Sequence, residues 1–118
     1  IQYAHARLCS IFTQWDGDEA NLNKADLALL TSPYELAVAA KLGEFPEIIE
    51  SAARELAPHI VAFYLKDLAA EFHSYYNAER MLVDDAALKE ARIALAGAVR
   101  QVIRNGLAIL GVSCPQSM

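Results

Sequence analysis

Apolar residues recur every three or four positions along most of this chain of 118 residues. The first such set comprises Ile1, Ala4, Leu8, Ile11, Phe12 and Trp15, which fall on one stripe of a helix. Similar sets follow between positions 61 and 75 and between 88 and 110. No segment alternates apolar and polar residues between two turn signals, as a half-buried strand would. The pattern predicts an all-α bundle of about five helices.

Capping residues predict where the later helices begin and end. Ser32-Pro33-Tyr34-Glu35 has the form of a capping box with proline at the first helical position, and Gly43 ends that helix. Pro46 begins a third helix whose apolar set is Ile48, Ile49, Ala52, Ala53 and Leu56. A fourth runs from Pro58 to about Asn77, and Asp84 or Asp85 caps a last one that stops at Gly111.

The polar stretch from Asp16 to Asp26 has no periodic apolar set and is expected to form a solvated loop. No linker rich in glycine, serine or proline divides the chain. We therefore expect residues 1–118 to form one domain.

Charge is segregated along the chain. The formal net charge is -5, yet all fifteen acidic residues lie between positions 16 and 90. The acid-free ends carry Arg7 at the start and Arg92, Arg100 and Arg104 near the finish. If the two ends meet in space, they could receive an anion such as a phosphate. Helical bundles also segregate charge to stabilise their own packing, so charge alone leaves both explanations open.

The sequence argues against a membrane protein and against a secreted one. The most apolar stretch, 93–110, is interrupted by Arg100, Gln101, Arg104 and Asn105, so we expect no membrane span. Two distant cysteines, Cys9 and Cys114, suit a reducing compartment, and we expect a cytoplasmic protein. The first residues lack a signal peptide and an initiator methionine, which suggests a piece cut from a longer protein.

No motif for catalysis or metal binding is present. His5, His59 and His73 are scattered without the spacing of zinc ligands, so we expect no metal site. Phosphate-binding loops, dinucleotide-binding loops and nucleophile elbows are also absent from the sequence. We expect no catalytic residue and no cofactor in this chain.

Tyrosines near arginine are the feature that most suggests binding. Tyr3 and Arg7 share the helix face opposite the apolar stripe. Tyr75 continues the apolar stripe of its helix, which leaves the adjacent Tyr76 as the freer ring. An exposed tyrosine can stack on an unpaired base, worth about 1 to 3 kcal/mol per base. Each of these rings could equally be an amphipathic edge of the core.

Three groups of residues resemble one known family. They are the opening Gln2-Tyr3-Ala4-His5-Ala6-Arg7; Glu55-Leu56-Ala57-Pro58-His59, continued through Tyr64-Leu65, Leu68-Ala69, Phe72 and Tyr76; and the ending Arg100-Gln101-Val102, Asn105-Gly106-Leu107, Leu110-Gly111-Val112, Pro115 and Met118. In this order they are similar to the C-terminal, DALR-type anticodon-binding domain of arginyl-tRNA synthetases. Cys114 departs from that family, which more often has alanine there.

The resemblance implies a function and a set of site residues. Tyr3, Arg7, Tyr76 and Met118 would hold the anticodon loop of tRNA(Arg): the two rings contact unstacked bases, Arg7 supplies charge and hydrogen bonds, and Met118 closes the pocket. It also implies that His5 and His59 are structural. The parent protein would be an arginine–tRNA ligase whose catalytic domain, outside these residues, attaches arginine to its tRNA with ATP.

Two alternatives stay open. One is a helical module whose exposed aromatic residues bind another protein. The other is the anticodon domain of a sister class I synthetase, such as the cysteinyl enzyme. The opening and ending motifs favour arginine. The arginine hypothesis requires the start of the chain, Tyr76 and Met118 to lie on one surface.

Overall fold

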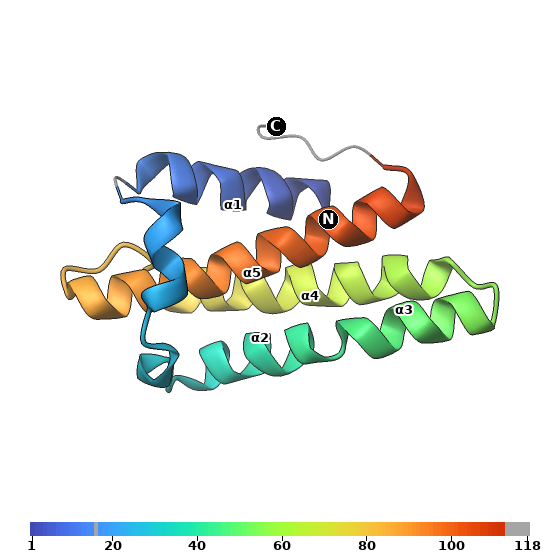
Figure 1. Ribbon diagram of the computed structural model, residues 1–118, viewed down its shortest axis with the longest axis horizontal. Coiled ribbons are helices and arrows are strands. Elements are labelled where there is room, and N and C mark those ends of the chain that lie inside the picture. The colour runs from blue at the N-terminus through green and yellow to red at the C-terminus, as the bar shows by residue number, and fades with distance from the viewer. Residues whose placement is uncertain (16, 113–118) are drawn as a thin grey trace.

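The computed structural model describes residues 1–15 and 17–112 and contains five α-helices and two short 3₁₀ helices within them (Figure 1). The α-helices are α1 (Gln2–Gln14), α2 (Pro33–Gly43), α3 (Phe45–Arg54), α4 (His59–Ala78) and α5 (Ala86–Leu110). The 3₁₀ helices are η1 (Glu19–Lys24) and η2 (Leu27–Leu29). The described part of the chain has no strand, and the all-α prediction is confirmed.

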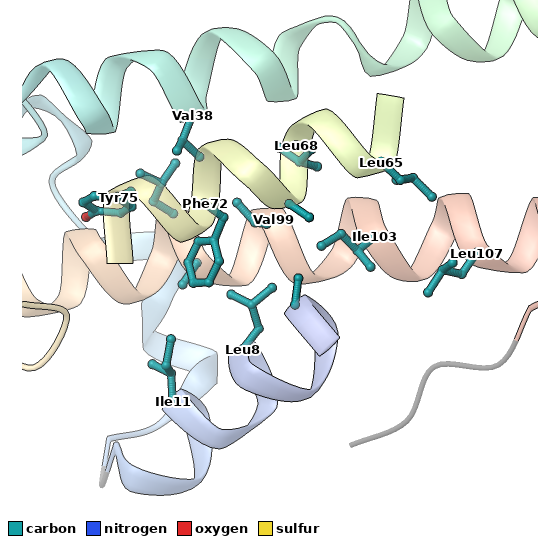
Figure 2. Packing of buried hydrophobic residues seen from close by; sticks show 14 of the residues in the cluster. Leu8, Ile11, Val38, Leu65, Leu68, Phe72, Tyr75, Val99, Ile103 and Leu107 are labelled. Carbon is teal, nitrogen blue, oxygen red and sulfur yellow. The ribbon is translucent and has the colours of Figure 1, made fainter. Parts of the chain in front are cut away.

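The long helices α4 and α5 form the centre of the bundle (Figure 1). Helices α2 and α3 follow one another along one side of α4, whereas α1 packs against α5 and α4 from the other side. Buried apolar side chains from four helices meet between them (Figure 2). The labelled ones are Leu8, Ile11, Val38, Leu65, Leu68, Phe72, Tyr75, Val99, Ile103 and Leu107. Most positions of the stripes predicted from the 3.6-residue period thus build the core, although Ala53 and Ala98, which were expected to face inward, are exposed.

The predicted helix caps are present. The Ser32 hydroxyl accepts a hydrogen bond from the Glu35 amide at 3.3 Å, and the Glu35 carboxylate accepts one from the Ser32 amide at 3.0 Å. Asp85 caps α5 by accepting from the amides of Ala87 and Leu88. Gly111 ends α5 in the left-handed conformation, with φ of 72°, which glycine adopts without steric cost.

Two local expectations are wrong. The stretch from Asp16 to Asp26 is not wholly a solvated loop, because η1 forms within it and Leu22 packs against the core. Leu56 does not belong to the apolar face of α3, which ends at Arg54. It is 89% exposed and has a positive φ of 51°, in a reversal of the chain where the Ala57 amide bonds to the carbonyl of Ala52.

Helix α5 is long and apolar enough, by length and composition alone, to cross a membrane. The core helix of a soluble bundle meets the same criterion. In this fold Ile93, Val99 and Ile103 on α5 are fully buried inside the bundle. The bundle core therefore accounts for the apolar face of α5, and the absence of a membrane span stays a prediction.

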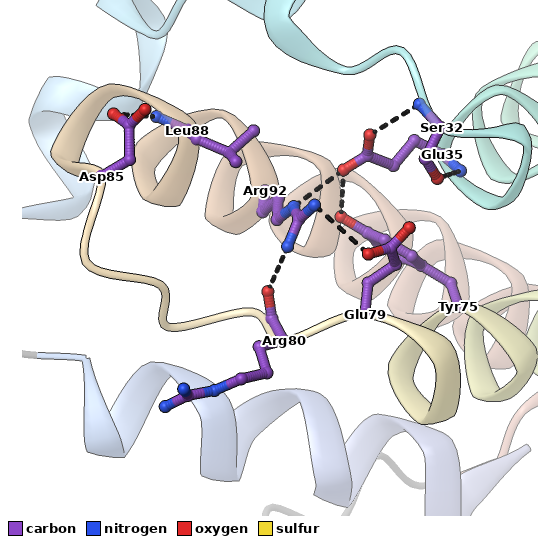
Figure 3. Close-up of polar contacts among 8 residues, drawn as sticks. All are labelled: Ser32, Glu35, Tyr75, Glu79, Arg80, Asp85, Leu88 and Arg92. Atoms are coloured by element: carbon purple, nitrogen blue, oxygen red, sulfur yellow. Dashed lines mark hydrogen bonds and ion pairs between the residues drawn. The ribbon is translucent and has the colours of Figure 1, made fainter.

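A buried polar network ties α2, α4 and α5 together (Figure 3). The Glu35 carboxylate, on a residue only 2% exposed, accepts hydrogen bonds from Arg92 Nε and from the Tyr75 hydroxyl, each at 2.9 Å. Arg92 also donates to the Arg80 carbonyl at 2.6 Å and to Glu79 at 3.5 Å. Burial, followed by the hydrogen bond to Glu35, raises the pKa of Tyr75 well above its usual range. The network fixes the end of α4, where Tyr76 follows.

Candidate nucleic-acid interface

Tyr3 and Arg7 lie together on the outer face of α1, as their spacing predicts. The Tyr3 ring is 54% exposed. The Arg7 guanidinium carbon lies 5.2 Å from the centre of that ring, and Arg7 Nη2 donates to the Tyr3 hydroxyl at 3.3 Å. This is a cation–π contact combined with a hydrogen bond between side chains one helical turn apart.

Tyr76 reaches the same place from α4. The Arg7 guanidinium carbon lies 4.4 Å from the centre of the Tyr76 ring, closer than it lies to Tyr3. Tyr76 is 37% exposed whereas Tyr75 is fully buried, so the predicted division between the two rings is confirmed. The structure therefore brings together three of the four predicted site residues, Tyr3, Arg7 and Tyr76, and Arg7 is the point that joins the two rings.

The fourth predicted residue, Met118, lies outside the described residues, as does Cys114. The closing of this surface by the chain's end therefore stays a prediction. The two helices nearest the ends of the chain, α1 and α5, do pack against each other.

A fourth member of the cluster was missed by the sequence reasoning. His73 on α4 places its Nδ1 3.3 Å from Arg7 Nη1, and its ring centre lies 5.8 Å from that of Tyr3. Partial burial, and then the Arg7 cation, lower the pKa of His73 from its usual value of 6.5. The spacing in the sequence could have indicated His73, because it lies three residues before Tyr76 and therefore on the same side of α4.

A hollow of about 320 Å³ opens beside Tyr76. Its wall is formed by residues of α1, of the end of α4 and of the segment that follows: Ile11, Gln14, Tyr76, Glu79, Arg80, Met81 and Leu82. This volume is at the lower end of the range for small-ligand pockets.

The other arginines of the acid-free segments are used within the fold. Arg100 pairs with Glu19 at 2.5 Å, and its guanidinium carbon lies 3.8 Å from the centre of the Phe12 ring. Arg104 donates to Nε2 of the buried His5 at 2.8 Å. Internal packing thus explains Arg100 and Arg104, and among the arginines of these segments Arg7 alone joins the described tyrosine cluster.

The two remaining histidines differ in their surroundings. His5 is fully buried, in agreement with the structural role that the resemblance implied. His59 is instead exposed at the start of α4, with its ring centre 5.7 Å from that of Phe63. The structural role that the resemblance implies for His59 stays a prediction.

A family model described as the DALR anticodon binding domain matches residues 1–118, the whole chain. The chain belongs to the DALR anticodon-binding domain family. This membership agrees with the resemblance seen in the three sequence motifs.

The DALR domain described here is similar to parts of longer proteins named arginine–tRNA ligase. One, from Dechloromonas aromatica (strain RCB), is 71% identical over 118 residues, which are all of this chain and 20% of that protein. Another, from Azoarcus sp. (strain BH72), is 64% identical over 118 residues, with the same coverage. The chain thus spans about a fifth of the length of these relatives.

Solved structures have the same fold. The arginyl-tRNA synthetase of Thermus thermophilus is 36% identical and superposes with a TM-score of 0.84 over 99% of this chain and 20% of that one. The arginyl-tRNA synthetase of Plasmodium falciparum superposes with a TM-score of 0.83 at 22% identity, over 98% of this chain and 20% of that one, and supports the fold alone.

Proposed function

We propose that this DALR domain holds the anticodon loop of tRNA(Arg) for an arginine–tRNA ligase. The observation that carries the proposal is the Arg7 guanidinium packed between two exposed tyrosine rings, 5.2 Å from Tyr3 and 4.4 Å from Tyr76. In a family named for anticodon binding, such a surface offers the two things an RNA loop requires: aromatic faces for bases and a cation for phosphates.

The chemistry of arginine codons fits this surface. Every arginine codon has G at its middle position, so every cognate anticodon has C at its centre. A protein reads such a base when it is swung out of the stack, where its face and its Watson–Crick edge become accessible. We propose that Tyr3 and Tyr76 stack on unstacked bases, with the hollow beside Tyr76 receiving one of them. Arg7 would then contact an adjacent phosphate or a base acceptor.

The remaining parts of the proposal lie outside the described residues. Met118 would close the pocket from the end of the chain. A catalytic domain elsewhere in the parent protein would bind ATP and join arginine to the tRNA, since this chain spans about a fifth of relatives that bear the name arginine–tRNA ligase. We also propose that the parent protein is located in the cytoplasm.

The test uses a full-length enzyme that carries this domain. Tyr76→Ala is expected to weaken binding of tRNA(Arg) by about five-fold to more than 100-fold, which is the equivalent of 1 to 3 kcal/mol for one lost stacking contact. Tyr34→Ala is the matched control, because Tyr34 is also an exposed tyrosine, 44% exposed, but lies on α2. Unchanged affinity in Tyr76→Ala, with the protein folded, would remove Tyr76 from the interface.

Salt dependence separates this function from the alternatives. Arg7→Gln should reduce the slope of log affinity against log salt by about 1, as expected for the loss of one phosphate contact. A protein-binding module would instead leave tRNA affinity independent of both Arg7 and Tyr76. Competition by tRNA(Cys) as strong as by tRNA(Arg) would favour the sister specificity.

A further inference from the structure

His73 has no role in the function proposed above, yet it lies within hydrogen-bond distance of Arg7 on the same helix as Tyr76. Arg7 Nη1 lies 3.3 Å from His73 Nδ1, and Arg7 Nη2 donates to the Tyr3 hydroxyl at 3.3 Å. The guanidinium thus has one hydrogen-bond partner on each side, while its face lies over Tyr76.

The hydrogen bond between Arg7 and His73 determines which nitrogen of the His73 ring carries the hydrogen. A guanidinium can only donate, so Nδ1 must present its lone pair and the ring must carry its hydrogen on Nε2. A protonated His73 would lose that acceptor and would place a second positive charge beside Arg7. Partial burial and the Arg7 cation both lower the pKa of His73, which keeps the ring in the accepting form at neutral pH.

A long side chain held in one position before RNA arrives loses less conformational entropy on binding. Arginine is costly to order, and at an exposed surface a cation–π contact alone restrains it weakly. The hydrogen bond from Arg7 to His73 adds a directional restraint that comes from a different helix. It therefore sets which way the remaining donors of Arg7 point.

We propose that His73 is a positioning residue of the RNA interface: its Nδ1 lone pair holds Arg7 across the rings of Tyr3 and Tyr76, with the free donors of Arg7 directed outward to RNA. The inference rests on the proposed function, because it assigns His73 a part in the same surface. His73 acts through Arg7 and need not touch the RNA.

Two substitutions separate the acceptor from the ring. His73→Phe keeps a ring against Tyr3 but has no acceptor, whereas His73→Asn loses the ring and keeps a carbonyl oxygen near the position of Nδ1. In the full-length enzyme, His73→Phe is expected to weaken tRNA(Arg) binding roughly five-fold, the scale of one typical lost hydrogen bond. His73→Asn is expected to recover most of that loss. Ser74→Ala, at the exposed neighbour of His73 on α4, is the control.

A double-mutant comparison tests whether His73 acts through Arg7. On an Arg7→Gln background, His73→Phe should weaken binding no further, because the side chain that it positions is already gone. Equal losses in His73→Phe and His73→Asn, or full additivity with Arg7→Gln, would overturn the proposal. Those results would indicate packing of the ring or a direct RNA contact instead.

The pH profile provides a second readout. The charged or titratable groups that face His73 are Arg7 and Tyr3, both on α1. No carboxylate in the described ranges, whether from α2, α3, α4 or α5, forms an ion pair with His73. As the pH falls below about 6.5, the affinity of the unmodified enzyme should fall relative to that of His73→Asn, a ratio that cancels other titrating groups. A rise in that ratio would mean that protonated His73 binds phosphate, and would overturn the positioning role.

The two proposals can fail separately. If Tyr76→Ala and Arg7→Gln weaken tRNA binding but His73→Phe does not, the role of His73 is wrong and the proposed function stands. If none of the three changes the affinity, both proposals are wrong.

Discussion

The buried pair between Glu35 and Arg92 makes the sharpest prediction about stability. Glu35→Gln keeps the size of the side chain and an oxygen that can cap α2, but it removes the negative charge opposite Arg92. The Arg92 side chain is only 10% exposed, and its other carboxylate partner, Glu79, is at 3.5 Å and 27% exposed. The substitution therefore leaves a largely buried cation with a weak partner.

The magnitude follows from that burial. Removing one partner of a buried ion pair costs about 3 to 5 kcal/mol. Because Glu79 and the Arg80 carbonyl still contact Arg92, we expect the lower end, about 3 kcal/mol. That is a large share of the 5 to 15 kcal/mol that usually separates folded from unfolded domains, as a rough range. A loss of about 3 kcal/mol corresponds to a urea midpoint lowered by about 1.5 M, if the free energy of unfolding falls by about 2 kcal/mol per M of urea.

Equilibrium unfolding in urea, followed by circular dichroism, is the assay. The matched control is Glu50→Gln, which breaks the pair with Arg54 at 3.6 Å, where the two side chains are 65% and 75% exposed. That change should cost less than about 0.5 kcal/mol, because exposed pairs contribute little. Adding Arg92→Met to Glu35→Gln should restore part of the loss, since no buried charge then remains.

A loss below about 1 kcal/mol in Glu35→Gln would refute the reasoning. It would mean that water solvates the Arg92 guanidinium, or that Glu79 pairs with it closely, once the Glu35 charge is gone. The reasoning would also be refuted if the loss in the double variant equalled the sum of the losses in Glu35→Gln and in Arg92→Met alone. Such additivity would show no coupling between the two charges.

Three further predictions concern other parts of the fold. Leu56→Gly should stabilise the domain by about 0.5 to 1 kcal/mol, seen as a higher Tm, because it removes the cost of a positive φ at a side chain that is 89% exposed. Gly106→Ala should destabilise by about 1 to 2 kcal/mol in urea unfolding, since the new Cβ would lie 2.6 Å from Cδ1 of the buried Leu65; a gain would mean that helix propensity outweighs this clash. Burial, and then the charge of Glu44, raise the pKa of Tyr64 from 10.0 to about 12. The hydroxyl of Tyr64 therefore stabilises the fold below pH 10 and loses that effect as the pH rises toward 12, so the stability difference between the protein and Tyr64→Phe should narrow over that range in alkaline unfolding curves.

Local periodicity and capping made much of the fold predictable. The capping box at Ser32, the stop at Gly111 and the division between Tyr75 and Tyr76 all follow from neighbours within one or two turns. Such signals are local in the chain, so a sequence carries them directly. The convergence of Tyr3 and Arg7 was predictable for the same reason.

Contacts between distant segments were not predictable in this way. Nothing near Glu35 indicates that its capping carboxylate also pairs with Arg92, and nothing near Arg7 indicates that it meets His73. Tyr76 was placed beside Tyr3 and Arg7 only by the family resemblance, because helical periodicity does not say which helices become neighbours. Leu56 was misassigned because periodicity continues through a position where the backbone already turns.

The proposed RNA interface and the core are connected through adjacent residues on α4. Neighbouring residues of a helix point about 100° apart, so the burial of Tyr75 determines the direction of Tyr76. The hydroxyl of Tyr75 is bonded to Glu35, so α4 cannot rotate about its axis without breaking a buried hydrogen bond. On α1, the buried Leu8 adjoins Arg7 in the same way. The positions of Tyr76 and Arg7 are therefore set by helix packing rather than by loops, and a substitution in the network around Glu35 should alter the proposed RNA binding only to the extent that it lets α4 turn.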